Sequence, residues 1–328
     1  MNLSNYFGIL FAYNYWVGMK IINITKYILL IGLAVLVCWV FPVFAEDDGN
    51  ETIDPIQAAE SEILARLNLA RSNPWAEAER LDLDPEVLRA EVVPEETAEQ
   101  WDQGLWPLVH NDVLHEVAKA HCEDMIERSF FSHVTPEGLI PEDRVFTGGY
   151  FAEIVREDMG ALAFNSFLDP GEATQILIDS LLRDSLTQKL SVEESTLLNE
   201  RVVEVGIALS GGETVIDGIG SLHVYVLCVV TARPTTAWHP IQCGHVCVDV
   251  NSNGWCEPDE CLPDVSLNVL DKRTLAVSNA RGAYCFARPG GWWVLEVTGE
   301  HFQQSWLPDV DWVDGGVIGK DIILPKVD

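Results

Sequence analysis

Twelve consecutive residues, Asp249–Glu260, have the spacing of a calcium-binding loop. Oxygen-bearing side chains stand at the first, third, fifth, ninth and twelfth positions, and Gly254 is the sixth residue, where such a loop turns sharply. Calcium is a hard cation that prefers several oxygen ligands, and this spacing directs them to one point. The alternative is an Asn- and Gly-rich turn that binds nothing. The expected ligands are Asp249, Asn251, Asn253, the carbonyl oxygen of Trp255, Glu257 and Glu260.

The chain has eight cysteines, of which Cys38 lies in an apolar N-terminal run. The remaining seven suit an exported protein, where disulfides are allowed, and their odd number leaves at least one thiol free or bonded to another molecule. Zinc is the competing interpretation of the Cys243–Cys247 and Cys256–Cys261 spacings, but no histidine-rich segment follows them. Cys122 and Cys228 could pair with each other or remain two buried thiols.

The N-terminal region has the charge order of an export signal. Lys20 and Lys26 precede an uncharged run, Tyr27–Ala45, and acidic residues follow it. We expect residues 1–45 to be a signal peptide, cleaved after Val43–Ala45. The run is also long enough to span a bilayer, so an uncleaved membrane anchor is the alternative. Either way the chain is expected to be secreted or attached at the cell surface.

The charge balance limits the partners of the protein. The 328 residues include 51 acidic and 20 basic side chains, a net charge of −31. This excludes a conventional nucleic-acid binder, which needs a positive field along the phosphates. It also argues against docking on anionic lipid headgroups. Membrane contact is therefore expected only through the N-terminal run.

Composition and periodicity divide the rest of the chain into two domains. An acidic linker, residues 46–56, precedes a first domain over residues 57–232. A second linker, residues 233–241, leads to a second domain over residues 242–328. The first domain has helical periodicities and then strand-like runs, which predicts an α+β fold. The second has short alternating runs between turn residues, which predicts a small all-β sandwich.

Three helices and one hairpin are expected in the first domain. Asp54 and Pro55 predict a helix start, and Asn73-Pro74 predicts its end. A second helix is expected from Asn111, and a third after Asp169–Gly171. Two strand-like runs separated by Gly-rich residues predict a hairpin, namely Val202–Leu209 and Leu222–Ala232.

Four segments occur in order along the first domain. They are Ile63–Arg71 with Asn73-Pro74; Trp106–Leu108 with Asn111, Leu114, Ala118, His121 and Met125; Phe130–His133 with Pro136–Gly138, Arg144 and Gly149-Tyr150; and Val205–Ala208. Together they resemble the CAP superfamily, which includes cysteine-rich secretory proteins, pathogenesis-related proteins and bacterial SCP-like proteins. The resemblance implies an α-β-α sandwich with a surface cleft.

In that family two histidines and two acidic residues often line the cleft, can bind a divalent metal, and in some members accompany lipid binding. His133 matches the first histidine, and Glu157 matches the glutamate of the family's Gly-Glu-Asn motif. The second histidine is replaced, because its motif falls on Ser180–Arg183. One histidine and one glutamate make a poor zinc site, so zinc is not expected in the cleft.

Two interpretations of the His133 and Glu157 pair remain open. The histidine could act as a base that the carboxylate orients, although a nucleophile would then be needed and Ser132 is only adjacent in sequence. The pair could instead tie the surrounding loops together by hydrogen bonds. His121 lies on the apolar face of its helix and is expected to be a core histidine.

The order of strand-like runs around the calcium loop resembles the calcium-binding B-type repeats of bacterial surface adhesins, a transthyretin-like β-sandwich related to carboxypeptidase regulatory domains. The resemblance covers residues 242–325 and implies that calcium stiffens the domain. The cysteines depart from that family. Cys256 and Cys261 could cross-link the end of the loop, and Cys247 and Cys285 could join two strands.

These observations favour a secreted or surface-attached binding module over an enzyme. The ligand expected for the first domain is a lipid, a small apolar molecule or a component of the cell envelope, and the second domain is expected to bind calcium. One alternative is a secreted hydrolase that uses His133 and Glu157. Another is a purely structural surface protein with calcium as its only ligand.

Overall fold

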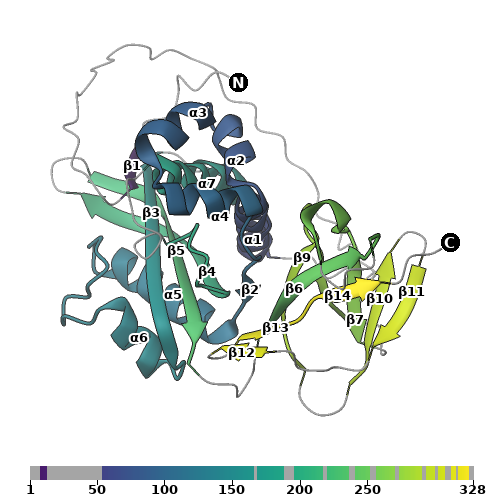
Figure 1. Cartoon of the computed structure of the whole chain (residues 1–328). Coiled ribbons are helices and arrows are strands. Elements are labelled where there is room, and N and C mark those ends of the chain that lie inside the picture. The colour runs from purple at the N-terminus through teal and green to yellow at the C-terminus, as the bar shows by residue number, and fades with distance from the viewer. Residues whose placement is uncertain are drawn as a thin grey trace, which may run out of the picture.

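The computed structural model contains an α-β-α domain followed by a β-domain (Figure 1). The apolar run Tyr27–Ala45 and the linker residues 46–53 lie outside the residues that it describes. None of the described helices combines the length and the apolar character needed to cross a membrane. The described residues are 8–12, 54–165, 168–187, 196–216, 220–235, 241–251, 256–269, 273–289, 293–299, 302–306, 312–314 and 317–324.

The middle layer of the first domain is a five-stranded sheet. Its strands are β1 (Gly8–Ala12), β2 (Val109–His110), β3 (Ala152–Phe164), β4 (Glu204–Ile216) and β5 (Gly220–Pro234). Their order in space is β1-β3-β5-β4-β2, and all neighbours are antiparallel except β2 and β4. The predicted hairpin is confirmed, since β4 and β5 pair along their length. Strand β1 falls within the predicted signal peptide, so cleavage after Ala45 would remove it from the sheet.

Helices cover both faces of this sheet (Figure 1). One face carries α1 (Pro55–Ser72), α2 (Pro74–Arg80), α3 (Pro85–Val87), a π-helical turn (Leu88–Val92), α4 (Glu95–Gln103) and α7 (Pro170–Thr187); the other carries α5 (Asp112–Glu127) and α6 (Pro141–Thr147). The first domain is therefore a three-layer α+β sandwich, as expected.

The predicted helix starts are confirmed by their caps. The Asp54 carboxylate accepts a hydrogen bond from the Ile56 amide at 2.9 Å. The Asn111 side chain accepts from the Val113 amide at 3.0 Å. Both caps satisfy amide groups that the first turn of a helix leaves unpaired. The short helices between Asn73 and Trp106 were not expected, because their prolines stand at first-turn positions, where they start a helix instead of breaking it.

The sheet separates two hydrophobic cores, and alternation along β3 assigns its side chains to them. Ile154 and Leu162 belong to the core against α1 and α7. Val155 and Met159 belong to the core against α5. By the same alternation, Glu157 faces the α5 side of the sheet.

Helix α5 lies unusually close to β4, and a glycine allows this approach. A Cβ atom on Gly206 would stand 2.0 Å from the carbonyl carbon of Leu114 and 2.2 Å from the amide nitrogen of His115. Any larger residue would therefore collide with backbone, which cannot move aside as a side chain can. The glycine fixes where α5 crosses the sheet.

The second domain contains two small sheets that enclose a separate core. One has the order β11-β10-β7-β8, and the other has β12-β13-β6-β14 with β9 paired to β6. Its described residues contain only one helical turn, Pro258–Glu260, so the predicted all-β character is confirmed. The strands are β6 (Ile241–Val248), β7 (Ser266–Val269), β8 (Thr274–Val277), β9 (Ala283–Ala287), β10 (Leu295–Gly299), β11 (Phe302–Trp306), β12 (Trp312–Asp314), β13 (Val317–Gly319) and β14 (Ile322–Leu324).

The disulfides differ from the expected pairs. Cys243 bonds to Cys285, because the antiparallel register of β6 and β9 places these two residues opposite each other, with Cα atoms 4.2 Å apart. Cys247 therefore does not bond to Cys285 and instead forms a disulfide with Cys256. Because Cys256 is used in this bond, Cys261 remains a free thiol. Both proposed pairings, Cys247–Cys285 and Cys256–Cys261, were wrong, since sequence spacing does not reveal strand register.

The two cysteines of the first domain are free and fully buried between α5 and the sheet. The Cys122 thiol donates to the carbonyl oxygens of Val226 and Ala208, at 3.4 and 3.6 Å. Burial raises the pKa of the Cys228 thiol well above its ordinary value. Of the two open alternatives, the structure has two buried thiols, which pack as small apolar groups.

Candidate functional site

The predicted pair forms a direct contact. His133, in the loop after α5, places its Nδ1 2.9 Å from Oε2 of Glu157 on β3. A third residue, Arg144 of α6, donates to the other carboxylate oxygen of Glu157 at 2.6 Å. Arg144 also donates to the His133 carbonyl at 2.7 Å and to the Leu139 carbonyl at 3.1 Å. The arginine therefore joins the strand, the loop and the helix at one point.

Glu157 is held as a carboxylate. Its side chain is only 1% exposed, and burial alone would raise its pKa. Hydrogen bonds from His133 and Arg144, with the charge of Arg144, outweigh this effect and hold the Glu157 pKa below its ordinary value. A buried carboxylate with both oxygens engaged in short hydrogen bonds is suited to bracing the surrounding segments.

His121 lies beneath this pair, as expected for a core histidine. It is 2% exposed, and its Nε2 lies 3.0 Å from the Ser132 carbonyl and 4.0 Å from Glu157 Oε2. Burial lowers the pKa of His121, although the Glu157 charge opposes this shift. Among the described residues, its Nδ1 is buried without a hydrogen-bond partner.

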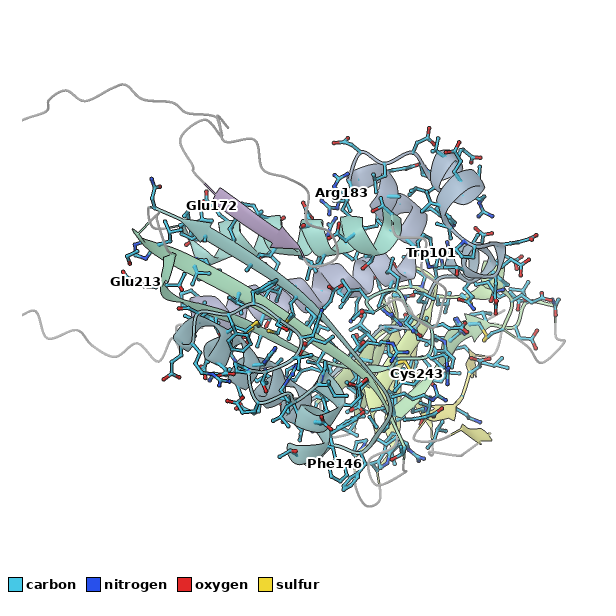
Figure 2. All side chains as sticks on the ribbon, turned by 90° about the vertical axis from the view of Figure 1, so that its left-hand side faces the viewer. Trp101, Phe146, Glu172, Arg183, Glu213 and Cys243 are labelled. Atoms are coloured by element: carbon cyan, nitrogen blue, oxygen red, sulfur yellow. A yellow bond between two sulfur atoms is a disulfide. The ribbon has the colours of Figure 1, made fainter. Side chains whose placement is uncertain are left out.

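Neither Ser132, the candidate nucleophile, nor Arg183, which stands where the second histidine is expected, completes a catalytic site with His133. The Ser132 hydroxyl accepts from the Val134 amide at 3.1 Å, which is a local turn contact. Arg183 lies on α7, on the other face of the sheet from Glu157, and donates to the Leu81 carbonyl at 2.5 Å. Figure 2 shows Arg183 far from Phe146, which belongs to α6. The replaced residue is thus not part of this site.

The segment that follows His133 exposes an unusual amount of apolar surface. The described residues include eleven exposed large hydrophobic side chains, and five of them fall within residues 134–151. Phe146 and Phe151 are 65% and 59% exposed, and the centroids of their rings lie 5.6 Å apart, edge to face. Phe146 points outward at one end of the molecule (Figure 2). We call Val134, Leu139, Ile140, Phe146 and Phe151 the apolar segment.

The apolar segment was not found by sequence reasoning. Its residues follow no single periodicity, because two loops and a short helix carry them. They differ from core residues only in being exposed to solvent, which depends on the tertiary structure. Arg144 lies within the segment and fixes it to Glu157. The sequence contained one signal, a run of Leu139-Ile140 followed by Phe146 and Phe151 in a chain of high charge.

The ends of the predicted calcium loop lie close together. Oε1 of Glu260 accepts from the amides of Val250 and Asn251, at 2.8 and 3.3 Å. Asn251 also donates to the Glu257 carboxylate at 2.6 Å. Glu260 is 6% exposed, and among the described residues its Oε2 is buried without a hydrogen-bond partner. The first-position residue, Asp249, is described, whereas Asn253 and Trp255 lie outside the described residues.

This arrangement fits a cation at the loop, because a buried carboxylate oxygen requires a donor or a cation. Within the described residues, no three His, Cys, Asp or Glu side chains form a metal-binding group. The expected set includes three described carboxylates, those of Asp249, Glu257 and Glu260, and they are not gathered into such a group here. Two of the remaining expected ligands, Asn253 and the Trp255 carbonyl, lie outside the described residues.

Cavities also lie elsewhere in the part of the chain that the structure describes, and His133 and Glu157 do not line the two considered next. One, of about 1060 Å³, lies between α1, α5 and β4. The other, of about 850 Å³, lies between the two domains beside Arg281. Arg281 donates to the Ser72 carbonyl at 3.0 Å and to the Asp102 carbonyl at 2.5 Å, so it links the β-domain to α1 and α4.

Comparisons with known proteins returned little. No family model matches the chain, and no curated protein matches it. Among solved structures, the chain is similar to an extracellular protein containing an SCP domain from Bacillus anthracis str. Ames, at 15% sequence identity and a TM-score of 0.27. The alignment covers 52% of this chain and 40% of that one, so the chain spans less than half the length of that protein.

Proposed function

We propose that this chain is a secreted, CAP-type binding module that docks on an apolar ligand or an uncharged lipid surface through the apolar segment. Docking on lipid would add a membrane contact beyond the N-terminal run, to which the sequence alone confined it. The observation that carries the proposal is the concentration of exposed apolar side chains on a segment that the hydrogen bond from Arg144 to buried Glu157 holds against the sheet. Phenylalanines that remain exposed to solvent and that no element among the described residues covers indicate a binding surface. The order of the four sequence segments and the α-β-α layering support the CAP-type assignment.

The bracing makes the segment a preformed surface. Arg144 joins the Leu139 and His133 carbonyls to the buried Glu157 carboxylate. Because these groups are fixed before a ligand arrives, binding loses less conformational entropy than it would with a free loop. The His133 and Glu157 pair is thus assigned a positioning role.

The expected contribution of the two aromatic rings can be estimated. A phenylalanine side chain offers roughly 200 Å² of surface, so rings that are 65% and 59% exposed can each bury about 120 Å² more. At about 25 cal/mol per Å², each ring contributes roughly 3 kcal/mol of gross free energy on entering an apolar phase. The net charge of −31 favours uncharged over anionic lipid.

Binding to vesicles tests this proposal. The full chain would be mixed with phosphatidylcholine vesicles, and the bound fraction measured by flotation. Phe146→Ala with Phe151→Ala is expected to remove most of the binding. Leu69→Ala with Val87→Ala is the matched control, because these exposed residues lie on α1 and α3. Equal binding of both double variants, or no binding by the natural chain to vesicles and to a soluble apolar probe, would contradict the proposal.

A hydrolase is the second candidate, and the 2.9 Å contact between His133 and Glu157 is the observation that favours it. A carboxylate that holds one ring nitrogen can leave the histidine oriented as a base. His133→Ala would then abolish hydrolysis of a suitable ester substrate under conditions where the variant is still folded, a loss far larger than the modest destabilisation expected from the missing hydrogen bond to Glu157. Unchanged turnover in that variant would exclude the histidine from any mechanism.

We further propose that calcium binds the loop Asp249–Glu260 and stiffens the β-domain. The buried Oε2 of Glu260, which has no hydrogen-bond partner among the described residues, supports this. Asp249, Asn251 and Glu257 would supply further oxygens, with Asn253 and the Trp255 carbonyl from residues outside the described ranges. Calcium at 100 times its dissociation constant would stabilise the fold by about 2.7 kcal/mol.

A thermal unfolding comparison tests the calcium proposal. The natural chain is expected to melt at a higher temperature in millimolar calcium than in chelator. Glu260→Gln should cancel the increase. Asp259→Asn is the matched control, since this exposed residue belongs to the loop but not to the expected ligand set. If the natural chain shows no calcium-dependent increase, or if both variants behave alike, the site is excluded.

A further inference from the structure

The cavity between α1, α5 and β4 has the form of a groove with a strand edge at its base. Helices α1 and α5 pack on opposite faces of the sheet at β4 (Figure 1). Strand β2 pairs with β4 only at Glu204 and Val205. Beyond Val205, β4 pairs with β5 alone among the described strands, so its other edge faces the groove. The cavity is about 1060 Å³ and includes Ile207, Leu209 and Gly211 in its lining.

The base of the groove presents backbone hydrogen-bonding groups. In an antiparallel pair, the N–H and C=O of one residue point to the same edge, and successive residues alternate. The Ile207 carbonyl accepts from Nδ1 of His115 at 2.7 Å, and the Leu209 amide donates to Oε1 of Glu60 at 3.0 Å. Both groups therefore point into the groove, and Gly211, two residues further, follows the same alternation.

Glu60 and His115 thus stand where the carbonyl and amide groups of a neighbouring strand would stand. One comes from α1 and the other from α5, and the two side chains approach to 4.0 Å. Side chains that cap a strand edge protect it from uncontrolled pairing. They can also be displaced, because side chains rotate at far lower cost than backbone.

The walls of the groove are acidic. Five carboxylates line it against one lysine: Asp54, Glu60, Asp112, Glu123 and Glu127, with Lys119. Glu123 and Glu127 lie on the exposed side of α5, and Asp112 is 98% exposed at its start. The excess of carboxylates over basic side chains therefore favours a cationic ligand, whereas the chain's own linker before Asp54 is acidic and would be repelled.

We infer that this groove binds an extended cationic peptide segment, which adds as a strand to the edge of β4. Backbone hydrogen bonds at Leu209 and Gly211 would provide affinity, and Lys or Arg side chains would meet the carboxylates of the walls. The groove shares no residue with the apolar segment or with the calcium loop, so this inference is independent of the proposed functions.

Fluorescence anisotropy with the full chain tests the inference. The probe is a labelled ten-residue peptide of alternating Lys and Val, with a Glu and Val peptide as its charge-reversed counterpart. We expect the cationic peptide to bind at low ionic strength and the acidic one not to bind. N-methylation of the backbone amides of the cationic peptide should weaken binding at least tenfold, because it removes the strand's donors but keeps its charge.

Matched variants locate the site. Glu123→Gln with Glu127→Gln should weaken binding of the cationic peptide about tenfold, because two exposed ion pairs are lost. Glu86→Gln with Glu91→Gln is the control, since these exposed residues lie outside the groove. Equal binding of the N-methylated peptide would show that charge alone attracts the peptide and would overturn strand addition. No binding of the cationic peptide, or equal losses in both double variants, would overturn the site.

Discussion

Replacement of Glu157 by Gln removes one buried charge while it keeps the shape of the side chain. The carboxylate accepts from His133 at 2.9 Å and from Arg144 at 2.6 Å. Hydrogen bonds to a charged group contribute about 1.5–3 kcal/mol each, and removal of one partner from a buried ion pair costs about 3–5 kcal/mol. Since Gln can still accept one hydrogen bond, we expect Glu157→Gln to lower the free energy of unfolding by about 3 kcal/mol at pH 7.

The assay is urea unfolding at a series of pH values, with Glu153→Gln as the control. Glu153 lies on the same strand, but its side chain is 46% exposed. It pairs with Arg201 at 3.2 Å and with the less exposed Arg233 at 3.5 Å, so its loss should cost about 1 kcal/mol. The folded-state pKa of Glu157 is lowered. The ionised Glu157 therefore contributes its full stabilisation of the folded state above the pKa of an unfolded glutamate, about 4.3. This stabilisation is lost as the pH falls through the lower pKa that Glu157 has in the folded state.

The difference between the natural chain and Glu157→Gln should thus be constant from pH 7 to about pH 5 and shrink below about pH 4. If Glu157→Gln costs no more than Glu153→Gln at pH 7, the network does not brace the segment. If the difference grows as the pH falls, the sign of the pKa shift is wrong.

Three further changes have definite expected outcomes. Gly206→Ala should lower the free energy of unfolding by at least about 3 kcal/mol in a urea melt, because its Cβ would meet backbone of Leu114 at 2.0 Å. Burial raises the pKa of Asp158 to about 7, so the folded state loses stability as the pH rises from about 4 toward 7. A shift of about three pH units corresponds to roughly 4 kcal/mol, so Asp158→Asn should raise the free energy of unfolding by about 4 kcal/mol at pH 8 and by little at pH 4. Replacing Cys243 and Cys285 by Ser should lower the free energy of unfolding, measured by thermal unfolding, by about 4 kcal/mol. The reason is that their disulfide closes a loop between residues 42 positions apart in the sequence.

Local signals in the sequence were sufficient for the elements that depend on neighbouring residues. The Asp54 and Asn111 caps fixed two helix starts, since a cap acts within three residues. The Val202–Leu209 and Leu222–Ala232 runs identified the hairpin, because both are rich in valine and Gly-rich residues separate them. Strand β3 was missed, because its residues 159–164 include no β-branched side chain.

The candidate site was predicted only in part. The resemblance brought His133 and Glu157 together, and the 2.9 Å contact agrees with that pairing. Arg144 was present among the same motifs, but its role as the link between Glu157 and the Leu139 carbonyl depends on how α6 folds back on β3. The calcium loop was recognised from spacing, whereas the burial of its Glu260 oxygen required the surrounding strands.

The α+β class of the first domain, the β character of the second and the helix starts follow from local sequence patterns, because periodicity and caps act over a few residues. Tertiary structure alone decided which cysteines pair, which face of β3 Glu157 occupies and which apolar side chains stay exposed. Each of these depends on strand register or on packing between segments far apart in the chain, as in the 42-residue separation of Cys243 and Cys285. The open edge of β4 is of the same kind, since it exists only because β2 ends after two residues.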